Sequence, residues 1–386
     1  MGSHEIETPL PQDILLIHIL PRLPGKSVHR FMCVCKKWWS FLTTPTFAEM
    51  HHQHRHKLLI ALSTTTPCKF STIDLEAPQD GLTVGRPLPF EASHENLWII
   101  ESLHGLVCLC MNNKCNGREY SDIILWNPLT GEYKITSRPN YEECFVTTSL
   151  LFGFYYIYND YRLLLVTKDH NVYIYSLKSD SWRKVETTQD DLNCLPHTHS
   201  VPHILQNEPC VFLNEKLYFI STPHTKISKR ENFIIIKRFD VKTEKWRKIA
   251  GPYINGLWKH CLSFLVVRGC IHLYLIHRHL RLDDNGGFIE LGDSTAELWR
   301  MDGEEDWTKV VTTYNLPNSH PRWFILHPLH LMKNGNWVMH VKRLEEFYEA
   351  DLEMRTKKEV YSYSRNAVFI TPKGKYIETL GINLSN

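Results

Sequence analysis

The chain has 386 residues, of which 43% are hydrophobic and 12% aromatic, so it exceeds one average domain and has ample apolar side chains for a packed core. A formal net charge of +2 at pH 7 provides no global field that favours nucleic acid or an anionic membrane as a partner. The longest apolar run, near residues 261–267, is far shorter than the roughly twenty residues of a membrane-spanning helix. We therefore expect an ordered globular protein that binds neither nucleic acid nor a membrane.

The first residues and the cysteines predict a location inside the cell. Residues 1–6 have neither the basic flank nor the apolar stretch of a secretory signal. The chain has 11 cysteines, an odd number, and most of them lie in apolar, strand-like runs, which indicates buried reduced thiols rather than a disulfide framework. We therefore expect the protein in the cytoplasm, the nucleus or both.

The first elements of the chain are predicted to be short helices. Pro11 suits the first position of a helix because it lacks the N–H that would have no partner there, and Pro21 ends the segment. Apolar residues cover more than one face of this helix, and a second helical stretch after Pro24 is equally apolar. A unit of this size cannot bury all of these side chains by itself. Periodicity leaves two interpretations open: a helical cap on a larger domain, or a helical module that docks onto a partner.

The order of the residues favours a docking module. Residues 10–15 (Leu-Pro-Gln-Asp-Ile-Leu), 19–24 (Ile-Leu-Pro-Arg-Leu-Pro) and 33–38 (Cys-Val-Cys-Lys-Lys-Trp) resemble the F-box, a helical module that docks a protein onto the Skp-type adaptor of a cullin ubiquitin ligase. The sequence departs from that pattern at Gly25 and at Val28-His29, where aliphatic residues are usual. The resemblance implies a set of apolar anchors that become buried on the adaptor, for which we expect Leu10, Pro11, Ile14, Ile19, Leu20, Leu23, Pro24, Phe31, Val34, Cys35 and Trp38.

A histidine-rich junction at residues 51–56 separates two different patterns. We interpret it as a solvated helix that links two modules, although a His-rich tract can also bind a metal ion. After it, helical spacing gives way to short alternating strands separated by turn residues. The predicted organisation is a tail at 1–9, the F-box-like module at 10–50, the junction at 51–56 and a β domain at 57–386.

A strand, a turn and a tryptophan recur in the β domain. The tryptophans of the three clear copies, Trp182, Trp246 and Trp307, are spaced 64 and 61 residues apart, and a weaker earlier copy contains Trp126 and ends at Tyr133. Short hairpin-like partners between the copies bring each unit to about four strands. Such a repeat is typical of a kelch-like β-propeller with about six blades, in which these tryptophans fill the gaps between neighbouring blades. A β-sandwich is the alternative, but its strands need not repeat as a unit. The predicted fold is thus an α+β multidomain chain, a small all-α module followed by an all-β propeller.

The β domain also resembles the plant F-box-associated domain, in a broad group that includes the S-locus F-box proteins. Stretches that carry the resemblance are Ser102–Leu109, Trp126–Pro128, Gly153–Tyr155, Asn159–Tyr161 and Val172–Trp182. The sequence departs from that group at position 162, where it has arginine in place of the usual lysine. Together with the N-terminal module, the resemblance covers most of the chain.

No catalytic motif is present: the sequence contains no Gly-x-Ser-x-Gly, no His-Glu-x-x-His and no Gly-rich phosphate loop. Cys108, Cys110 and Cys115 lie near His104, but they lack the paired spacing of zinc sites, and a Cys-x-Cys on a strand simply places two thiols on one face. The remaining candidate ligands are His197, His199 and His203. We expect no metal, no cofactor and no catalytic residue.

The prediction for function is a substrate receptor of a Skp-cullin-F-box ubiquitin ligase. Its partners would be the Skp-type adaptor, the cullin through that adaptor, and an unknown target protein held by propeller loops at residues 65–95, 187–209 and 278–294. Residues 226–248 contain nine lysines and arginines but three acidic residues, which we interpret as a solvated basic blade edge. A scaffold without degradation is one alternative, and a catalytic kelch-type propeller is another.

Overall fold

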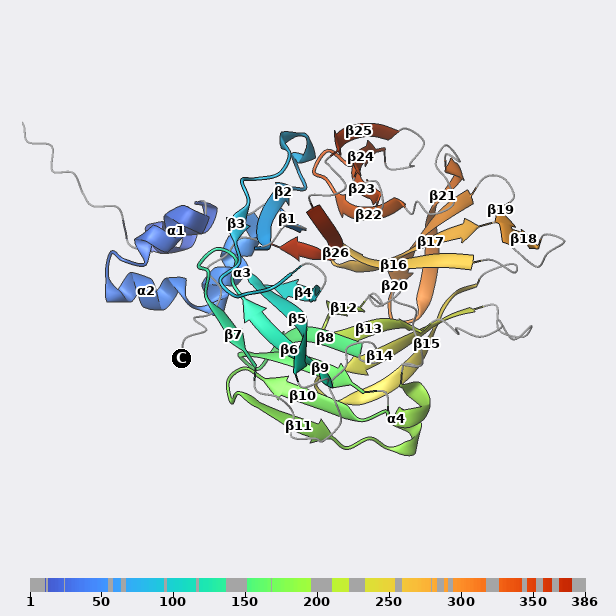
Figure 1. Ribbon diagram of the computed structural model, residues 1–386, viewed down its shortest axis with the longest axis horizontal. Coiled ribbons are helices and arrows are strands. Elements are labelled where there is room, and N and C mark those ends of the chain that lie inside the picture. Colours follow the sequence, from blue (N-terminus) through green and yellow to red (C-terminus); the bar gives the residue numbers. More distant parts are fainter. Residues whose placement is uncertain are drawn as a thin grey trace, which may run out of the picture.

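The structure is a computed structural model that describes residues 11, 13–23, 25–54, 58–63, 67–93, 96–115, 118–136, 151–167, 169–195, 210–221, 233–253, 259–278, 280–282, 288–290, 294–316, 326–341, 346–351, 357–362 and 368–376. Two parts are visible in Figure 1: a ring of small sheets, and a group of helices that projects from one side of it.

The ring is a six-bladed β-propeller, as the repeat predicts. Each blade is a four-stranded antiparallel sheet. The second blade consists of β4 (Leu97–Leu103), β5 (Leu106–Cys115), β6 (Arg118–Trp126) and β7 (Tyr133–Ile135). The third blade consists of β8 (Leu151–Ile157), β9 (Asp160–Val166), β10 (Val172–Ser176) and β11 (Ser181–Val185). The fourth blade consists of β12 (Cys210–Leu213), β13 (Lys216–Ser221), β14 (Phe233–Asp240) and β15 (Lys245–Tyr253). The fifth blade consists of β16 (Lys259–Val267), β17 (Cys270–Arg278), β20 (Ser294–Asp302) and β21 (Asp306–Leu316). The sixth blade consists of β22 (Leu326–Leu331), β23 (Trp337–Val341), β24 (Glu346–Ala350) and β25 (Lys357–Ser362). A separate hairpin consists of β18 (Leu280–Leu282) and β19 (Phe288–Glu290).

The first blade closes the ring because it combines strands from both ends of the β domain. Its order is β26 (Val368–Tyr376), β1 (Leu58–Ser63), β2 (Lys69–Asp74) and β3 (Arg86–Pro87). The last strand pairs antiparallel with the first, with Leu58 opposite Tyr376 and Ser63 opposite Val368. Main-chain hydrogen bonds therefore join the two ends of the propeller in one sheet.

Six apolar clusters hold the propeller together, one between each pair of neighbouring blades. The recurring tryptophans lie in these clusters, with Trp126 and Trp246 buried and Trp182 and Trp307 half-buried. Their positions are not equivalent: Trp182, Trp246 and Trp307 stand on the fourth strand of their blades, whereas Trp126 is on the third strand, opposite Tyr133. A twisted sheet that buries both faces against neighbours needs such large side chains wherever the blades diverge.

The helices that precede the first blade form a second, smaller unit. They are the π-helix η1 (Ile14–Ile19), the 3₁₀-helix η2 (Leu20–Arg22), α1 (Gly25–Phe31), α2 (Lys36–Leu42) and α3 (Pro45–His54). We call residues 13–54 the helical module. Two further short helices, η3 (Pro78–Asp80) and α4 (Gln189–Cys194), lie within the propeller chain. Among the residues that the structure describes, no helix is long and apolar enough to cross a membrane.

Candidate functional site

The helical module has its own small core. Leu16, Leu20, Val28, Leu42 and Phe47 are buried in it. Half-buried aromatic side chains pack around this core. Among them, Phe31 and Trp38 form an edge-to-face pair with ring centroids 5.7 Å apart. This core accounts for some of the apolar residues of the sequence, but not for all of them.

Five large apolar side chains of the helical module remain exposed. Their exposed fractions are 41% for Ile14, 47% for Ile17, 37% for Ile19, 59% for Val34 and 42% for Trp39. They come from η1, from the turn between α1 and α2, and from α2. We call them the exposed apolar set. Exposed apolar side chains gathered on so small a unit are typical of an interaction surface.

The expected adaptor anchors fall into three groups. Pro11, Ile14, Ile19, Val34 and Cys35 are exposed, whereas Leu20 is buried and Leu23, Phe31 and Trp38 are half-buried and pack in the core of the module. Leu10 and Pro24 lie outside the described residues. The second group can therefore support a docking surface from within, but the first group is the one available for direct contact in the free chain.

Ile17, Trp39 and Cys33 are exposed residues that the expected anchor set leaves out. Charge also marks this region: no Asp or Glu occurs between Ile14 and Ala48, whereas that stretch has five lysines and arginines. This absence of acidic residues can be seen in the sequence alone. It could have identified the whole module as a candidate binding region, and not only its apolar positions.

The His51 side chain is not solvated, so the expectation of a solvated helix at the histidine-rich junction is wrong at this position, while residues 55–56 lie outside the described residues. Helix α3 extends to His54, and the His51 side chain is fully buried. Its ring stacks on Phe47 with centroids 5.7 Å apart, and Nε2 lies 2.9 Å from the carbonyl oxygen of Leu23. The reason is geometric: residues 47 and 51 are one helical turn apart, so both side chains face the core of the module.

A turn of the second blade contacts the helical module. The side chain of Asn127 is fully buried, and its Oδ1 accepts hydrogen bonds from the backbone N–H groups of Leu129 and Thr130 at 2.9 and 3.4 Å. This turn directs Leu129 into the apolar core of the module. Asn side chains stabilise turns in this way because they bond the backbone two and three residues ahead. The Trp-Asn-Pro-Leu stretch thus joins the helices to the propeller.

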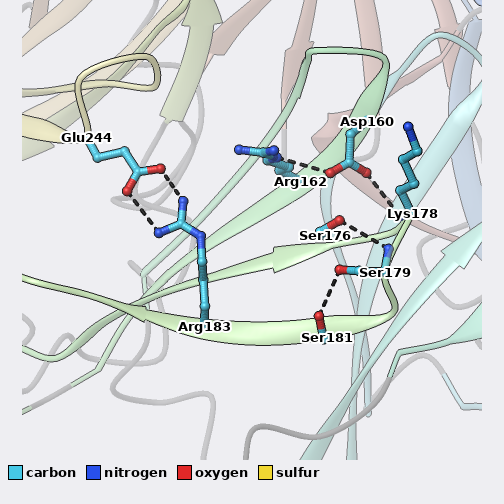
Figure 2. Close-up of polar contacts among 8 residues, drawn as sticks. All are labelled: Asp160, Arg162, Ser176, Lys178, Ser179, Ser181, Arg183 and Glu244. Carbon is cyan, nitrogen blue, oxygen red and sulfur yellow. Dashed lines mark hydrogen bonds and ion pairs between the residues drawn. The ribbon is translucent and has the colours of Figure 1, made fainter.

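Polar residues of blades three and four contact one another, within blade three and between the two blades (Figure 2). The buried Asp160 carboxylate accepts hydrogen bonds from Nε of Arg162 at 3.1 Å and from the backbone N–H of Lys178 at 3.0 Å. Arg183 on β11 forms a two-point ion pair with Glu244 in the β14–β15 turn of the next blade. These polar groups are engaged with one another, so they are structural contacts.

The basic stretch at residues 226–248 is not simply a solvated edge. Lys237 and Arg238 on β14 are buried, each with 4% exposure. Lys237 donates to the carbonyl oxygen of Asn193 in α4 at 3.4 Å, and Arg238 lies 3.3 Å from the Glu304 carboxylate of the next blade. Both faces of β14 are covered by neighbouring elements, which the charge count alone cannot reveal. The expected basic residues at 226, 229 and 230 lie outside the described residues.

The two ends of the propeller differ in their connections. Because successive strands are antiparallel, first-to-second and third-to-fourth connections leave one end of each sheet, and all others leave the opposite end. Most connections at the first end are short turns, such as Tyr158-Asn159 between β8 and β9 and Asn214-Glu215 between β12 and β13; the exception is residues 75–85, which connect β2 to β3 and include η3. The chain enters β1 at this end, and Leu129 lies in a connection of this end. The helical module therefore adjoins the short-turn end.

Two of the three expected target-binding loops leave the opposite end. Residues 187–209 connect the third blade to the fourth and include α4, and residues 278–294 connect the second strand of blade five to its third and include β18 and β19. Residues 196–209 and 283–287 lie outside the described residues. The described part of residues 65–95 is not a single loop, because β2 and β3 are the two outer strands of the first blade and η3 lies between them in the chain.

The candidate metal ligands of the sequence do not assemble in the described part of the chain. There, no group of three or more His, Cys, Asp and Glu side chains could hold a metal ion. Cys108 and Cys110 both face the third blade and are buried, and burial raises the pKa of both thiols. His197, His199 and His203 lie outside the described residues.

Comparisons with known proteins agree with this architecture. The family described as F-box associated beta propeller domain matches residues 87–363. Putative F-box only protein 15 of Arabidopsis thaliana is 25% identical over 201 residues, which cover 49% of this chain and 50% of that protein. F-box protein At5g65850 of the same plant is 27% identical over 325 residues, covering 80% of this chain and 71% of that protein. The chain thus spans about half the length of the first relative.

Among solved structures, "Structure of YjhT" aligns over 80% of this chain and 91% of that one, with 10% identity and a TM-score of 0.39, which is too low to carry a conclusion. The family match, in contrast, covers more than half of the chain. This chain belongs to the plant F-box proteins that carry an F-box-associated β-propeller domain.

Proposed function

We propose that the protein is the substrate-recognition subunit of a Skp-cullin-F-box ubiquitin ligase. In this proposal residues 10–50 are the F-box, residues 51–56 lead into the propeller at 57–386, and the chain itself carries no catalytic group. The observation that carries the proposal is the exposed apolar set, which lies on a helical module that already has a core of its own. Burial of such side chains against an adaptor would supply the affinity.

The target would bind at the end of the propeller opposite to the helical module. Long connections leave that end, whereas the module adjoins the short turns. Loops on a rigid scaffold are the usual place for recognition. This arrangement separates the two binding surfaces, so the adaptor and the target could be held at the same time.

Co-purification with a Skp-type adaptor tests the proposal. Val34→Asp and Ile14→Asp each place a charge where an apolar anchor would be buried, so each is expected to weaken adaptor binding at least tenfold. Val84→Asp is the matched control, because Val84 is 89% exposed and lies on the propeller between η3 and β3. It should bind like the unaltered chain.

Circular dichroism and thermal unfolding of each variant keep loss of folding apart from loss of binding. If the well-folded unaltered chain does not bind the adaptor, the helical module is only a helical cap on the propeller. Adaptor binding without any rise in target level on proteasome inhibition would favour the scaffold alternative instead.

A further inference from the structure

We propose that Cys33 and Cys35 form a thiol-modification site, at which a mixed disulfide with glutathione blocks adaptor docking; the blocking rests on the proposed function. Both cysteines are exposed, at the turn between α1 and α2. Val34 separates them and is the most exposed member of the exposed apolar set. Modification of either thiol would therefore occur at the docking surface itself.

Exposure distinguishes these two thiols from the other six cysteines whose side chains the structure describes. Cys68, Cys108, Cys110 and Cys210 are buried, and Cys194 and Cys270 are half-buried. Burial raises the pKa of the thiols at positions 68, 108 and 110, which keeps them protonated. Only a thiolate attacks a disulfide, and the attack also requires access. Selectivity for positions 33 and 35 over these six cysteines follows from the fold.

The surroundings of the two thiols suit an anionic modifier. Arg30, Lys36 and Lys37 are exposed next to them in the chain, and no acidic residue occurs between Ile14 and Ala48. Glutathione disulfide carries more carboxylates than amines, so it has a net negative charge at neutral pH. Electrostatic attraction thus favours its encounter with this turn over encounter with a neutral surface.

The chemical step is thiol–disulfide exchange. A thiolate of Cys33 or Cys35 attacks one sulfur of glutathione disulfide, a protein–glutathione S–S bond forms, the original S–S bond breaks, and one glutathione thiolate leaves. The protein sulfur is oxidised and the departing glutathione is reduced, so electrons balance without another reactant. The adduct covers the exposed side of the turn with a bulky, charged peptide, which opposes apolar docking at Val34.

Adaptor binding and modification must oppose each other reciprocally. If an adduct weakens adaptor binding by a given factor, bound adaptor disfavours the adduct by the same factor. Saturating adaptor should accordingly protect Cys33 and Cys35 from glutathione disulfide. It should leave the slower reaction of the half-buried thiols unchanged, which gives an internal reference.

The test uses the full-length chain, reduced and then exposed to glutathione disulfide. Peptide mass mapping should locate adducts at Cys33 or Cys35, adaptor affinity should fall at least tenfold, and dithiothreitol should restore it. Whatever adaptor affinity reduced Cys33→Ser/Cys35→Ser retains should not change on treatment with glutathione disulfide. Cys194→Ser/Cys270→Ser, the matched control, should lose binding like the unaltered chain.

The outcomes separate this proposal from the one on which it rests. Adducts that form faster at another cysteine, or no adducts at Cys33 and Cys35, overturn the site; adducts at Cys33 or Cys35 without loss of adaptor binding overturn the switch. A reduced, folded chain that binds no adaptor overturns the proposed function and the switch with it, while the mass map still decides whether these thiols are selectively modified.

Discussion

Nε2 of His51 lies 2.9 Å from the carbonyl oxygen of Leu23, a contact between residues 28 positions apart in the chain. It ties α3, which leads into the first blade, to the end of η2. With the stacking of His51 on Phe47, it fixes how the helices of the module are arranged around their core. The arrangement of the exposed apolar set depends on this packing.

His51→Phe should keep the stacked ring but remove the hydrogen bond to Leu23. The carbonyl is then left without this donor, and we expect a loss of about 1 kcal/mol in the free energy of unfolding of the module. Chemical denaturation followed by tryptophan fluorescence measures it. His29→Phe is the control, since His29 is exposed on α1; equal effects of the two substitutions would contradict the role of His51.

Leu129→Ala should loosen the helical module from the propeller without unfolding either. Leu129 is half-buried against the core of the module, so removal of its apolar surface should cost about 1–2 kcal/mol. Limited proteolysis should then cleave faster between α3 and β1. Unchanged cleavage would mean that Leu129 contributes little to the joint. Leu192→Ala, at a more exposed position on α4, should leave the cleavage unchanged.

Gly153→Ala should destabilise the interface between blades three and four. A Cβ at this position would lie 2.7 Å from Cδ1 of Leu217 and 3.3 Å from Cζ of Phe219, both in the fourth blade. Overpacking of this kind costs about 1–3 kcal/mol. Leu217→Ala in the same chain should recover part of the loss by removing the clash. A double variant whose loss equals the sum of the two single losses would argue against direct contact.

Asp191→Asn should make folding less sensitive to acid. Burial by itself would raise the pKa of Asp191, but hydrogen bonds from Thr188, from the backbone N–H of Trp246 and from Lys245 lower the pKa to about 2. A carboxyl with a lowered pKa stabilises the fold above its unfolded value of 3.8, and this contribution disappears as the pH falls towards 2.

At pH 7 the unaltered chain should therefore exceed Asp191→Asn in stability by about 2 kcal/mol. The difference should shrink as the pH is lowered from 4 towards 2, which urea denaturation at each pH would show. Asp190→Asn is the matched control, because Asp190 is the exposed neighbour on the same helix. A constant difference across this pH range would assign the effect to helix capping rather than to charge.

Local chemistry explains which features the sequence predicts well. A strand-turn-Trp unit recurs because each blade solves the same problem, burial of a twisted sheet on both faces, so the repeat predicts the propeller and a number of about six blades. The Leu-Pro elements likewise predict short helices, because proline restricts the chain wherever it stands. In both cases neighbouring residues suffice to set the pattern.

The features that the sequence leaves open depend on residues far apart in the chain. His51 is buried because α3 folds back onto η2, Arg238 is buried because Glu304 of the next blade reaches it, and residues 69–74 form a strand because β1 offers an edge. Which apolar residues of the helical module stay exposed, and that Cys33 and Cys35 stand among them, is also a result of packing. The types of element and their repetition can be predicted from the amino-acid sequence, since they follow from contacts within a few residues. Burial and exposure depend instead on the packed fold, because each is a property of the surfaces that distant elements bring together.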